Sequence, residues 1–157
     1  MAEVHTPEFI EYSQKVINNA KHLGKYLVEK YGETLFAGGT EVHHIIWDVS
    51  KHGISGNQME KVYDKMRIST NKKGLIGDKV STIAGGMRIG TPAVTTRGMG
   101  EKEMEVIGDF LLKGVEIAKR IQDGLGGPDC DFNEFVKAVE NDNEVKETSL
   151  KVKAFAT

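Results

Sequence analysis

The sequence predicts an α+β fold, in which a small, mainly antiparallel sheet carries long helices packed on one face. Two long segments have apolar residues at helical spacing, which predicts helices over about residues 7–31 and 101–122. Between them lie short, glycine-bounded stretches rich in β-branched and aromatic residues, a pattern typical of strands. The 157 residues, 39% of them hydrophobic, are enough for one core, so we expect a single domain over 1–157.

The first helix has clear signals at both ends. Thr6 is a good N-cap, Pro7 suits the first helical position, and Gly32 suits the end. Strands are then predicted over residues 35–37 and 42–49, with the two glycines at 38 and 39 marking the bend between them.

The second half of the chain repeats these signals. Ser55 is predicted to cap a helix with apolar positions up to Met66, and a strand should centre on residues 87–89, after a loop over 72–79 rich in lysine and glycine. Asp131, with an acidic residue three positions on, predicts the cap of a last helix. The polar chain ends, residues 1–5 and about 142–157, are expected to fray.

Composition and charge exclude several function classes. The net charge is −2, and the basic and acidic residues are dispersed, so we expect neither a nucleic acid nor an anionic membrane as partner. No apolar run is long enough to span a membrane, and no glycine-rich phosphate motif follows a strand. Cys130, the single cysteine, lies between two aspartates that disfavour a thiolate, so we expect it to be structural or incidental, in a reducing compartment.

Residues 85–98, which read GGMRIGTPAVTTRG, hold the strongest candidate for a binding residue. Arg88 follows two glycines and precedes Pro92, so its backbone should be held in a sharply turned segment. Guanidinium is a planar, permanently charged fork that matches both oxygens of a carboxylate. Arg88 is therefore a candidate for binding an acid or amino acid. The residues alone leave open a solvated arginine or one paired with a surface acid.

This segment resembles the run "G-[IL]-R-[LV]-G-T-P-A-[LIV]-T-[ST]-R-G" of the serine hydroxymethyltransferase family. Three further segments agree with family motifs in the same order. Residues 6–12 (TPEFIEY) resemble "T-P-E-F-K-x-Y", residues 38–43 (GGTEVH) resemble "G-G-[ST]-D-N-H", and residues 68–73 (ISTNKK), followed by Gly77-Asp78-Lys79, resemble "I-T-A-N-K-N … G-D-K". The resemblance covers roughly residues 5–122 and then fades.

The resemblance implies a transferase of one-carbon metabolism, in which pyridoxal 5'-phosphate and tetrahydrofolate serve the interconversion of serine and glycine. Arg88 would bind the α-carboxylate of the amino-acid substrate, and Asn71 would reach the folate. Arg97 and His43 also match the family, and we interpret both as structural support. The chain would be the C-terminal small domain of a fold-type I pyridoxal-phosphate enzyme, partnered by an N-terminal large domain and by further copies in a homo-oligomer.

The family binds the cofactor through a lysine in a "T-T-T-H-K" run that this sequence lacks. Lys72 does not match that lysine. We therefore expect no catalytic residue and no covalently bound cofactor in this chain, and an isolated chain that is inactive. The cytoplasm is the expected compartment, with an organellar form left open because the true N-terminus is expected to be missing.

His43, His44, Asp48 and His52 fall within ten residues, but we do not expect them to form a metal site. On a strand, the His43 and His44 side chains would point to opposite faces, and no cysteine or helical histidine pair completes a ligand set. The same loop departs from the family, because Glu41, Val42 and His44 replace an aspartate, an asparagine and an apolar residue.

Two other functions remain open. One is a standalone, non-catalytic small domain that binds a carboxylate metabolite or a full-length partner. The other is the small domain of a different fold-type I enzyme, such as an aminotransferase or aldolase. Folate binding, which the segment around Asn71 favours, would separate the latter from the main hypothesis.

Overall fold

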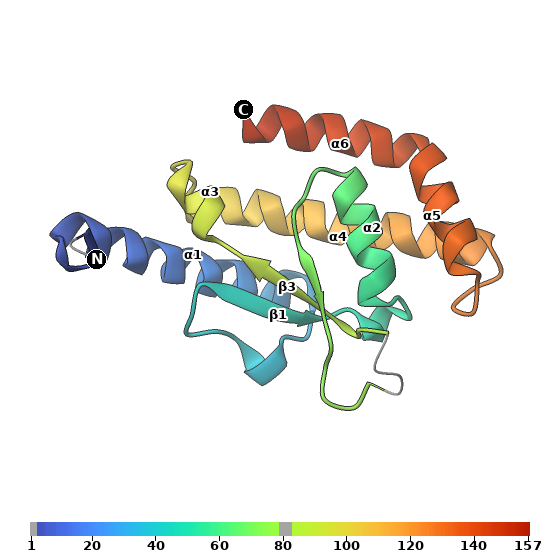
Figure 1. Ribbon diagram of the computed structural model, residues 1–157, viewed down its shortest axis with the longest axis horizontal. Coiled ribbons are helices and arrows are strands. Elements are labelled where there is room, and N and C mark those ends of the chain that lie inside the picture. Colours follow the sequence, from blue (N-terminus) through green and yellow to red (C-terminus); the bar gives the residue numbers. More distant parts are fainter. Residues whose placement is uncertain (1–2, 79–82) are drawn as a thin grey trace. The chain divides into compact units, whose positions relative to one another are not determined.

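The computed structural model describes residues 3–78 and 83–157, and in them it has the predicted α+β architecture (Figure 1). Lys79 of the family-like loop lies outside the described residues. Six α-helices and a three-stranded sheet in the order β1-β3-β2 are formed by this part of the chain. Their bounds are α1 Pro7–Tyr31, β1 His44–Asp48, α2 Gly56–Lys65, β2 Asn71–Lys73, β3 Gly86–Gly90, α3 Pro92–Thr96, α4 Glu101–Gly124, α5 Phe132–Asn141 and α6 Asn143–Ala156, with short 3-10 turns at Glu3–His5, Phe36–Gly38 and Ser50–His52.

The chain divides into two compact units. The first comprises Met1–Trp47 and Ile89–Gly108, and the second Asp48–Arg88 and Asp109–Thr157, so that β1, β3 and α4 each contribute to both. Each unit is described below by itself.

The first unit is built on α1, which begins and ends as predicted. The Thr6 hydroxyl accepts a hydrogen bond from the Phe9 amide, and Gly32 takes the left-handed conformation, with φ of 69°, that terminates the helix. Next to the helix end, the indole of Trp47 donates to a carboxylate oxygen of Glu33 at 2.8 Å, in a buried position. The buried face of the helix consists of Val16, Asn19, Ala20, Leu23, Gly24 and Leu27.

The prediction of a strand over residues 35–37 is wrong. Leu35 makes only an isolated bridge to Trp47, and the following residues form a 3-10 turn in which Ala37 has a φ of 57°. A left-handed residue reverses the chain and cannot continue a ladder. The strand predicted over residues 42–49 does form, over the shorter range of β1.

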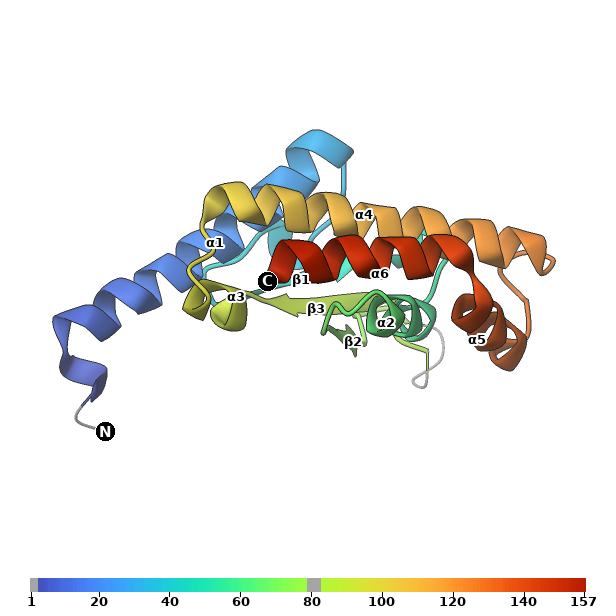
Figure 2. The same cartoon turned by 90° about the horizontal axis from the view of Figure 1, so that it is seen from above.

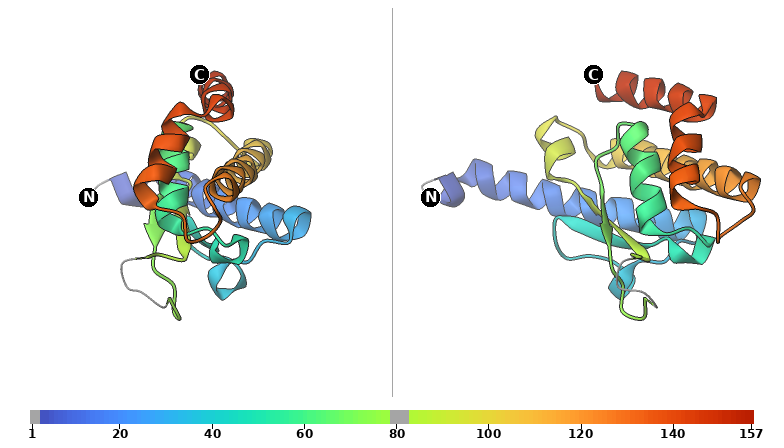
Figure 3. Two further views of the ribbon diagram at one scale, coloured as in Figure 1. Left: turned by 90° about the vertical axis from the view of Figure 1, so that its right-hand side faces the viewer. Right: turned by 45° about the vertical axis from the view of Figure 1, so that its right-hand side comes forward.

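The second unit packs α2 against α5 and β2, and Figure 3 shows α2 and α5 side by side. Ser55 caps α2 as predicted, and Gln58 completes a capping box by bonding back to the Ser55 amide. In the core of the unit, the buried Tyr63 donates its hydroxyl to the carbonyl oxygen of Leu111 at 2.8 Å.

The C-terminal segment, expected to fray beyond Asn141, forms the 14-residue helix α6. Asp142 caps this helix, because its carboxylate accepts a hydrogen bond from the Val145 amide. The same carboxylate forms an ion pair with Arg120 at 2.7 Å. Helix α6 thereby lies along the part of α4 that belongs to the second unit, as Figure 2 shows. In the sequence, Asp142 is the one feature of this polar segment that could have predicted the helix, because aspartate is a favourable N-cap residue.

Strand β2 was not predicted, because the sequence around it reads as a loop. It pairs antiparallel with β3, and the Cα partners are Asn71 with Arg88, Lys72 with Met87, and Lys73 with Gly86. This register places Asn71 directly opposite Arg88, the two residues predicted separately to bind ligands.

Candidate functional site

The candidate site is the Asn71–Arg88 pair on the neighbouring strands β2 and β3. In the orientation that satisfies both polar atoms of its amide, Asn71 accepts a hydrogen bond from Arg88 Nη2 at 2.9 Å. The amide nitrogen of Asn71 then donates to the carbonyl oxygen of Thr70 at 3.0 Å. The pair is a cross-strand contact between directly opposed residues, which fixes both side chains on one face of the sheet.

Arg88 presents its guanidinium to solvent. Its strand neighbours Met87 and Ile89 are buried, and the alternation along a strand places Arg88 on the opposite, exposed face. Within residues 3–78 and 83–157, Arg88 takes part in no ion pair. The structure therefore supports neither an arginine neutralised by a surface acid nor a buried one. It shows an exposed cation whose hydrogen-bond partner is a neutral amide.

The backbone of β3 is fixed at its start by the N-terminus of α2. The Gly56 amide donates to the carbonyl oxygen of Ala84 at 2.7 Å, and the Ala84 amide donates to the Asn57 side chain at 3.1 Å. The approach is so close that a Cβ on Gly56 would lie 2.5 Å from the carbonyl oxygen of Gly86. Glycine at position 56 is thus required by packing, and it leaves the start of β3 little freedom to move.

Asp78 holds the two ends of the loop between the strands. Its Oδ2 atom accepts the amide of Leu75 at 2.7 Å and that of Gly85 at 3.0 Å. The Gly85 carbonyl in turn accepts the amides of Val49 and Ser50. A carboxylate that accepts two backbone amides ties two distant points of the chain together. Asp78 belongs to the family-like Gly77-Asp78 motif, but nothing in the sequence alone predicts this role.

The other two residues predicted for the site belong to the first unit. Arg97 is exposed and ends α3. The carbonyl of His43 accepts both the amide and the hydroxyl of Thr91. His43 precedes β1, and its ring lies 4.7 Å from that of His44, with 3.4 Å between their nitrogens. The expectation that the two rings point to opposite faces was therefore wrong, because the strand begins only at His44.

No group of three or more histidine, cysteine, aspartate or glutamate side chains in the described part of the chain is arranged to hold a metal ion. No helix among these residues is long and apolar enough to cross a membrane.

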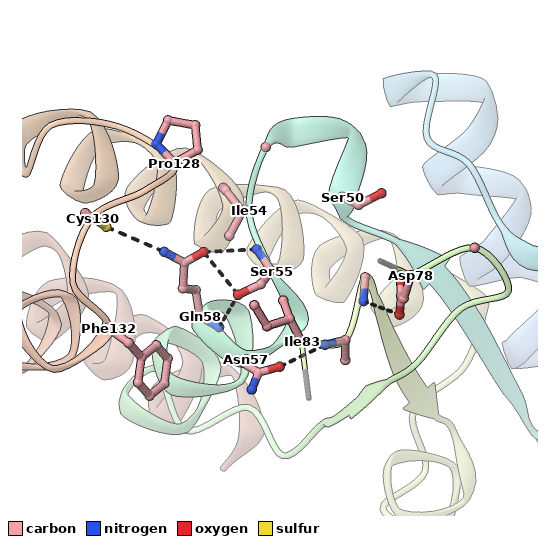
Figure 4. Close-up of a pocket in the computed structure, with 14 residues that line it drawn as sticks. Ser50, Ile54, Ser55, Asn57, Gln58, Asp78, Ile83, Pro128, Cys130 and Phe132 are labelled. Carbon is pink, nitrogen blue, oxygen red and sulfur yellow. Dashed lines mark hydrogen bonds between the residues drawn. The ribbon is translucent and has the colours of Figure 1, made fainter. Parts of the chain in front are cut away.

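The second unit also contains a cavity of about 620 Å³ between the start of α2 and the segment before α5 (Figure 4). The amide of Gln58 points at the Cys130 sulfur, 3.7 Å away. Burial is the main cause that raises the pKa of the Cys130 thiol, and the charges of Asp131, Glu134 and Asp129 add to it, as the flanking aspartates predicted. Neither Asn71 nor Arg88 lines this cavity, which is therefore separate from the candidate site.

Comparison with known proteins gives one consistent result. A family model described as serine hydroxymethyltransferase matches residues 1–111. The chain is 40% identical over 155 residues to serine hydroxymethyltransferase 5 of Arabidopsis thaliana, which covers 99% of the chain and 32% of that protein. It is 38% identical over 152 residues to the chloroplastic serine hydroxymethyltransferase 3 of the same plant, covering 96% of the chain and 28% of the relative. A cytosolic relative from Saccharomyces cerevisiae is 35% identical over 148 residues, covering 94% of the chain and 31% of the relative. The chain spans about a third of the length of these proteins.

Proposed function

Because this chain belongs to the serine hydroxymethyltransferase family, we propose that it acts as the C-terminal domain of an enzyme that interconverts serine and glycine. In that reaction a one-carbon unit passes to or from tetrahydrofolate. The relatives match along almost the whole chain, and the chain keeps both Arg88 and Asn71. Activity, substrates and partners belong to the complete enzyme.

Arg88 binds the α-carboxylate of the amino acid in this proposal. The observation that carries the assignment is the exposed guanidinium on a fixed strand, without an ion pair in the described residues and hydrogen-bonded to a neutral amide. Arginine has five N–H donors, and the bond to Asn71 uses only one of them. The remaining donors can hold a carboxylate through charge-assisted bonds and so orient the amino acid.

Asn71 contacts the folate. Its amide oxygen accepts the bond from Arg88, and one of its two N–H groups goes to Thr70, which leaves the second N–H for an acceptor on the pteridine or its linker. The same side chain thus orients the arginine and binds the second substrate. This arrangement would bring the binding of the two substrates under the control of one pair of strands.

Arg88 and Asn71 can donate hydrogen bonds to the two substrates, but the lysine that binds the cofactor in the family is absent from this chain. Lys72 is the nearest candidate by sequence, but its ammonium is ion-paired with Glu60 at 2.7 Å, which does not suit an amine that must act as a nucleophile. Pyridoxal phosphate, when bound, supplies the electron sink for the carbanion at the α-carbon. We propose that the N-terminal large domain holds it, and that this chain binds and orients the amino acid.

We also propose that the complete enzyme is a homo-oligomer and is located in the cytoplasm. Relatives include proteins named cytosolic and chloroplastic, so the compartment is tested by imaging a fluorescent fusion of the complete gene product. Exclusive organellar fluorescence would overturn it. The mass of the complete enzyme in solution tests the assembly.

The main test is a hybrid in which this chain replaces the matching 31% of the Saccharomyces cerevisiae relative. We expect the hybrid to turn over serine. Arg88→Gln should lower kcat/KM for serine about 10²–10⁴-fold, because two bonds to a charged group contribute about 1.5–3 kcal/mol each. Arg97→Gln, in the same motif, is the matched control and should cost less than about tenfold. Unchanged serine kinetics in the Arg88 variant would overturn the assignment.

The purified 157-residue chain provides a second test. We expect no turnover of serine and no cofactor absorbance band that depends on a single lysine, and we expect activity when the rest of the enzyme is added. Tight binding of a carboxylate metabolite without restored activity would favour a standalone binding module. A hybrid that binds amino acids but not folate would favour another fold-type I enzyme.

A further inference from the structure

Strand β2, which carries Asn71, has little to hold it in place by itself. It is three residues long, all three side chains are polar and exposed, and it is an edge strand beyond β3. Edge strands this short bury almost no apolar surface, so backbone pairing alone leaves them marginal. The position of Asn71 therefore depends on an anchor from outside the sheet.

Glu60 on α2 supplies that anchor. Its Oε2 atom lies 2.7 Å from Lys72 Nζ, and its Oε1 atom accepts the backbone amide of Lys72 at 3.3 Å. One carboxylate thus holds both the side chain and the backbone of the residue next to Asn71. The Glu60 side chain is only 18% exposed, so water competes less for these bonds than at an open surface.

The ionisation of Glu60 agrees with this contact. Partial burial by itself would raise the pKa of the Glu60 carboxyl, but hydrogen bonds from the side chain and backbone of Lys72, and the charges of Lys72 and Lys61, outweigh it and lower the pKa. Glu60 is therefore negatively charged at neutral pH.

The geometry separates the anchor from the ligand face. Lys72 is opposite the buried Met87, and a Cβ on Gly56 of α2 would lie 3.3 Å from the Lys72 Cβ, so Lys72 faces α2. Successive side chains of a strand point to opposite faces, which places Asn71 and Arg88 on the other side. Glu60 can therefore fix β2 without contacting anything bound by Asn71.

We propose that Glu60 is a positioning residue, which holds Asn71 in its ligand-binding place by clamping Lys72 against α2. This inference rests on the proposed role of Asn71 in binding folate. Glu60 contacts β2 directly and affects β3 only through the pairing of the two strands, so its loss should affect the two strands unequally. Loss of the clamp should therefore weaken the ligand of Asn71 more than the ligand of Arg88.

Amide exchange in the 157-residue chain tests the clamp without any ligand. In Glu60→Gln, the Lys72 amide should exchange about three- to tenfold faster, and the side-chain amide resonances of Asn71 should shift. The matched control is Glu140→Gln, which breaks another ion pair to a lysine of α2, Lys65, at 2.9 Å. It should leave the exchange of Lys72 unchanged. Equal exchange of Lys72 in the chain without substitutions and in both variants would overturn the proposal.

Kinetics of the hybrid enzyme test the consequence for binding. Glu60→Gln should raise the KM for tetrahydrofolate about three- to tenfold, with kcat and the KM for serine changed less than twofold. Lys72→Met should have the same effect, and Lys72→Arg, which keeps the ion pair, should restore most of the affinity. An effect of Lys72→Met without one of Glu60→Gln would mean that Lys72 itself contacts folate, which contradicts the clamp.

Asn71→Ala separates the two proposals. If this variant leaves the KM for folate unchanged, the proposed role of Asn71 fails. If it raises the KM for folate while Glu60→Gln does not, Asn71 binds folate but the inference about Glu60 fails.

Discussion

Two regions of the second unit are held in place by different means. We call residues 71–78 and 83–88 the site segment, and α5 with α6 the C-terminal helix pair. The site segment is fixed by hydrogen bonds to its backbone, which involve the Gly56 amide and the carboxylates of Asp78 and Glu60. The helix pair is fixed by buried apolar side chains such as Phe135, and by ion pairs of Asp142 and Glu144 with Arg120.

The difference indicates where ligands can bind. The charged side chains that anchor the helix pair, Asp142 and Glu144, are already paired with Arg120, so they have little to offer a ligand. Arg88 in the site segment does not need its charge to hold the strand, because the backbone is fixed by other residues. A charge that is both exposed and dispensable for folding is the more promising functional candidate. We expect the site segment to be more sensitive to packing than the helix pair is.

The largest effect should follow from Gly56→Ala. The new methyl group would meet backbone oxygens of Gly86 at 2.5 Å and Ala84 at 3.1 Å, and backbone cannot turn aside as a side chain can. We expect a loss of about 1–3 kcal/mol or more in the free energy of unfolding, measured by urea denaturation. The site segment should show the largest increase in amide exchange.

Gly124→Ala is the matched control for this substitution. Gly124 is the last residue of α4 and has no heavy atom within 4 Å of the added carbon, so alanine should be neutral or slightly stabilising. If Gly56→Ala is as stable as Gly124→Ala, the tight crossing of α2 and β3 does not exist in solution.

The next largest effect is expected for Asp78→Ala, which leaves the amides of Leu75 and Gly85 without their acceptor. Loss of bonds to a charged, partly buried acceptor costs about 1–3 kcal/mol. Amide exchange should rise at these two residues and at Arg88, and not in the helix pair. Asp129→Ala, at an exposed aspartate, is the control. Faster exchange confined to the helix pair would contradict the comparison.

Most elements could be predicted from the sequence because their signals are local. Thr6, Ser55 and Asp131 each cap the helix that follows, through side chains that bond to amides two or three residues away. Strand β2 could not be predicted, since three polar residues form a strand only where β3 supplies the partner. The error at residues 35–37 has a local cause, the left-handed Ala37, that apolar patterning does not reveal.

The candidate site was predictable in its members but not in its arrangement. Arg88 stood out by its position between glycines and a proline, and Asn71 by resemblance to the family. Their contact depends on a register that no local pattern specifies. Glu60 gave no signal at all, because a glutamate on a helix surface is usually solvated, and only the fold brings Lys72 to it.

In the helix pair, Asp142→Ala should have a smaller effect than the two changes in the site segment. It removes the N-cap of α6 and the partner of Arg120, which together cost about 0.5–2 kcal/mol. We expect α6 to lose helicity in far-UV circular dichroism and to become the first site of proteolysis, while exchange at Lys72 stays unchanged. A global loss of protection that includes β2 would show that the two regions are not independently anchored.

The smallest effect is expected for the response of the helix pair to acid. Partial burial by itself would raise the pKa of the Asp142 carboxyl, but the bonds to Arg120 and to backbone amides outweigh it and lower the pKa. The pKa of the Glu144 carboxyl is also lowered, chiefly by its hydrogen bond with Lys113. A carboxyl whose pKa is lower in the folded state stabilises that state at pH above its ordinary value. This stabilisation is lost as the pH falls through the folded value.

The contribution should therefore be constant from about pH 5 upward and decrease progressively below about pH 4. The variant Asp142→Asn isolates it, because asparagine caps a helix as well as aspartate does but cannot ionise. At pH 7 the variant should be less stable by at most about 1 kcal/mol, since the Arg120 side chain is half exposed. The difference from the unsubstituted chain should shrink as the pH falls below the ordinary pKa of an aspartate and vanish below the folded pKa. A difference that persists at low pH would assign the role of Asp142 to shape alone, and the helix pair would then be held by packing without a contribution from charge.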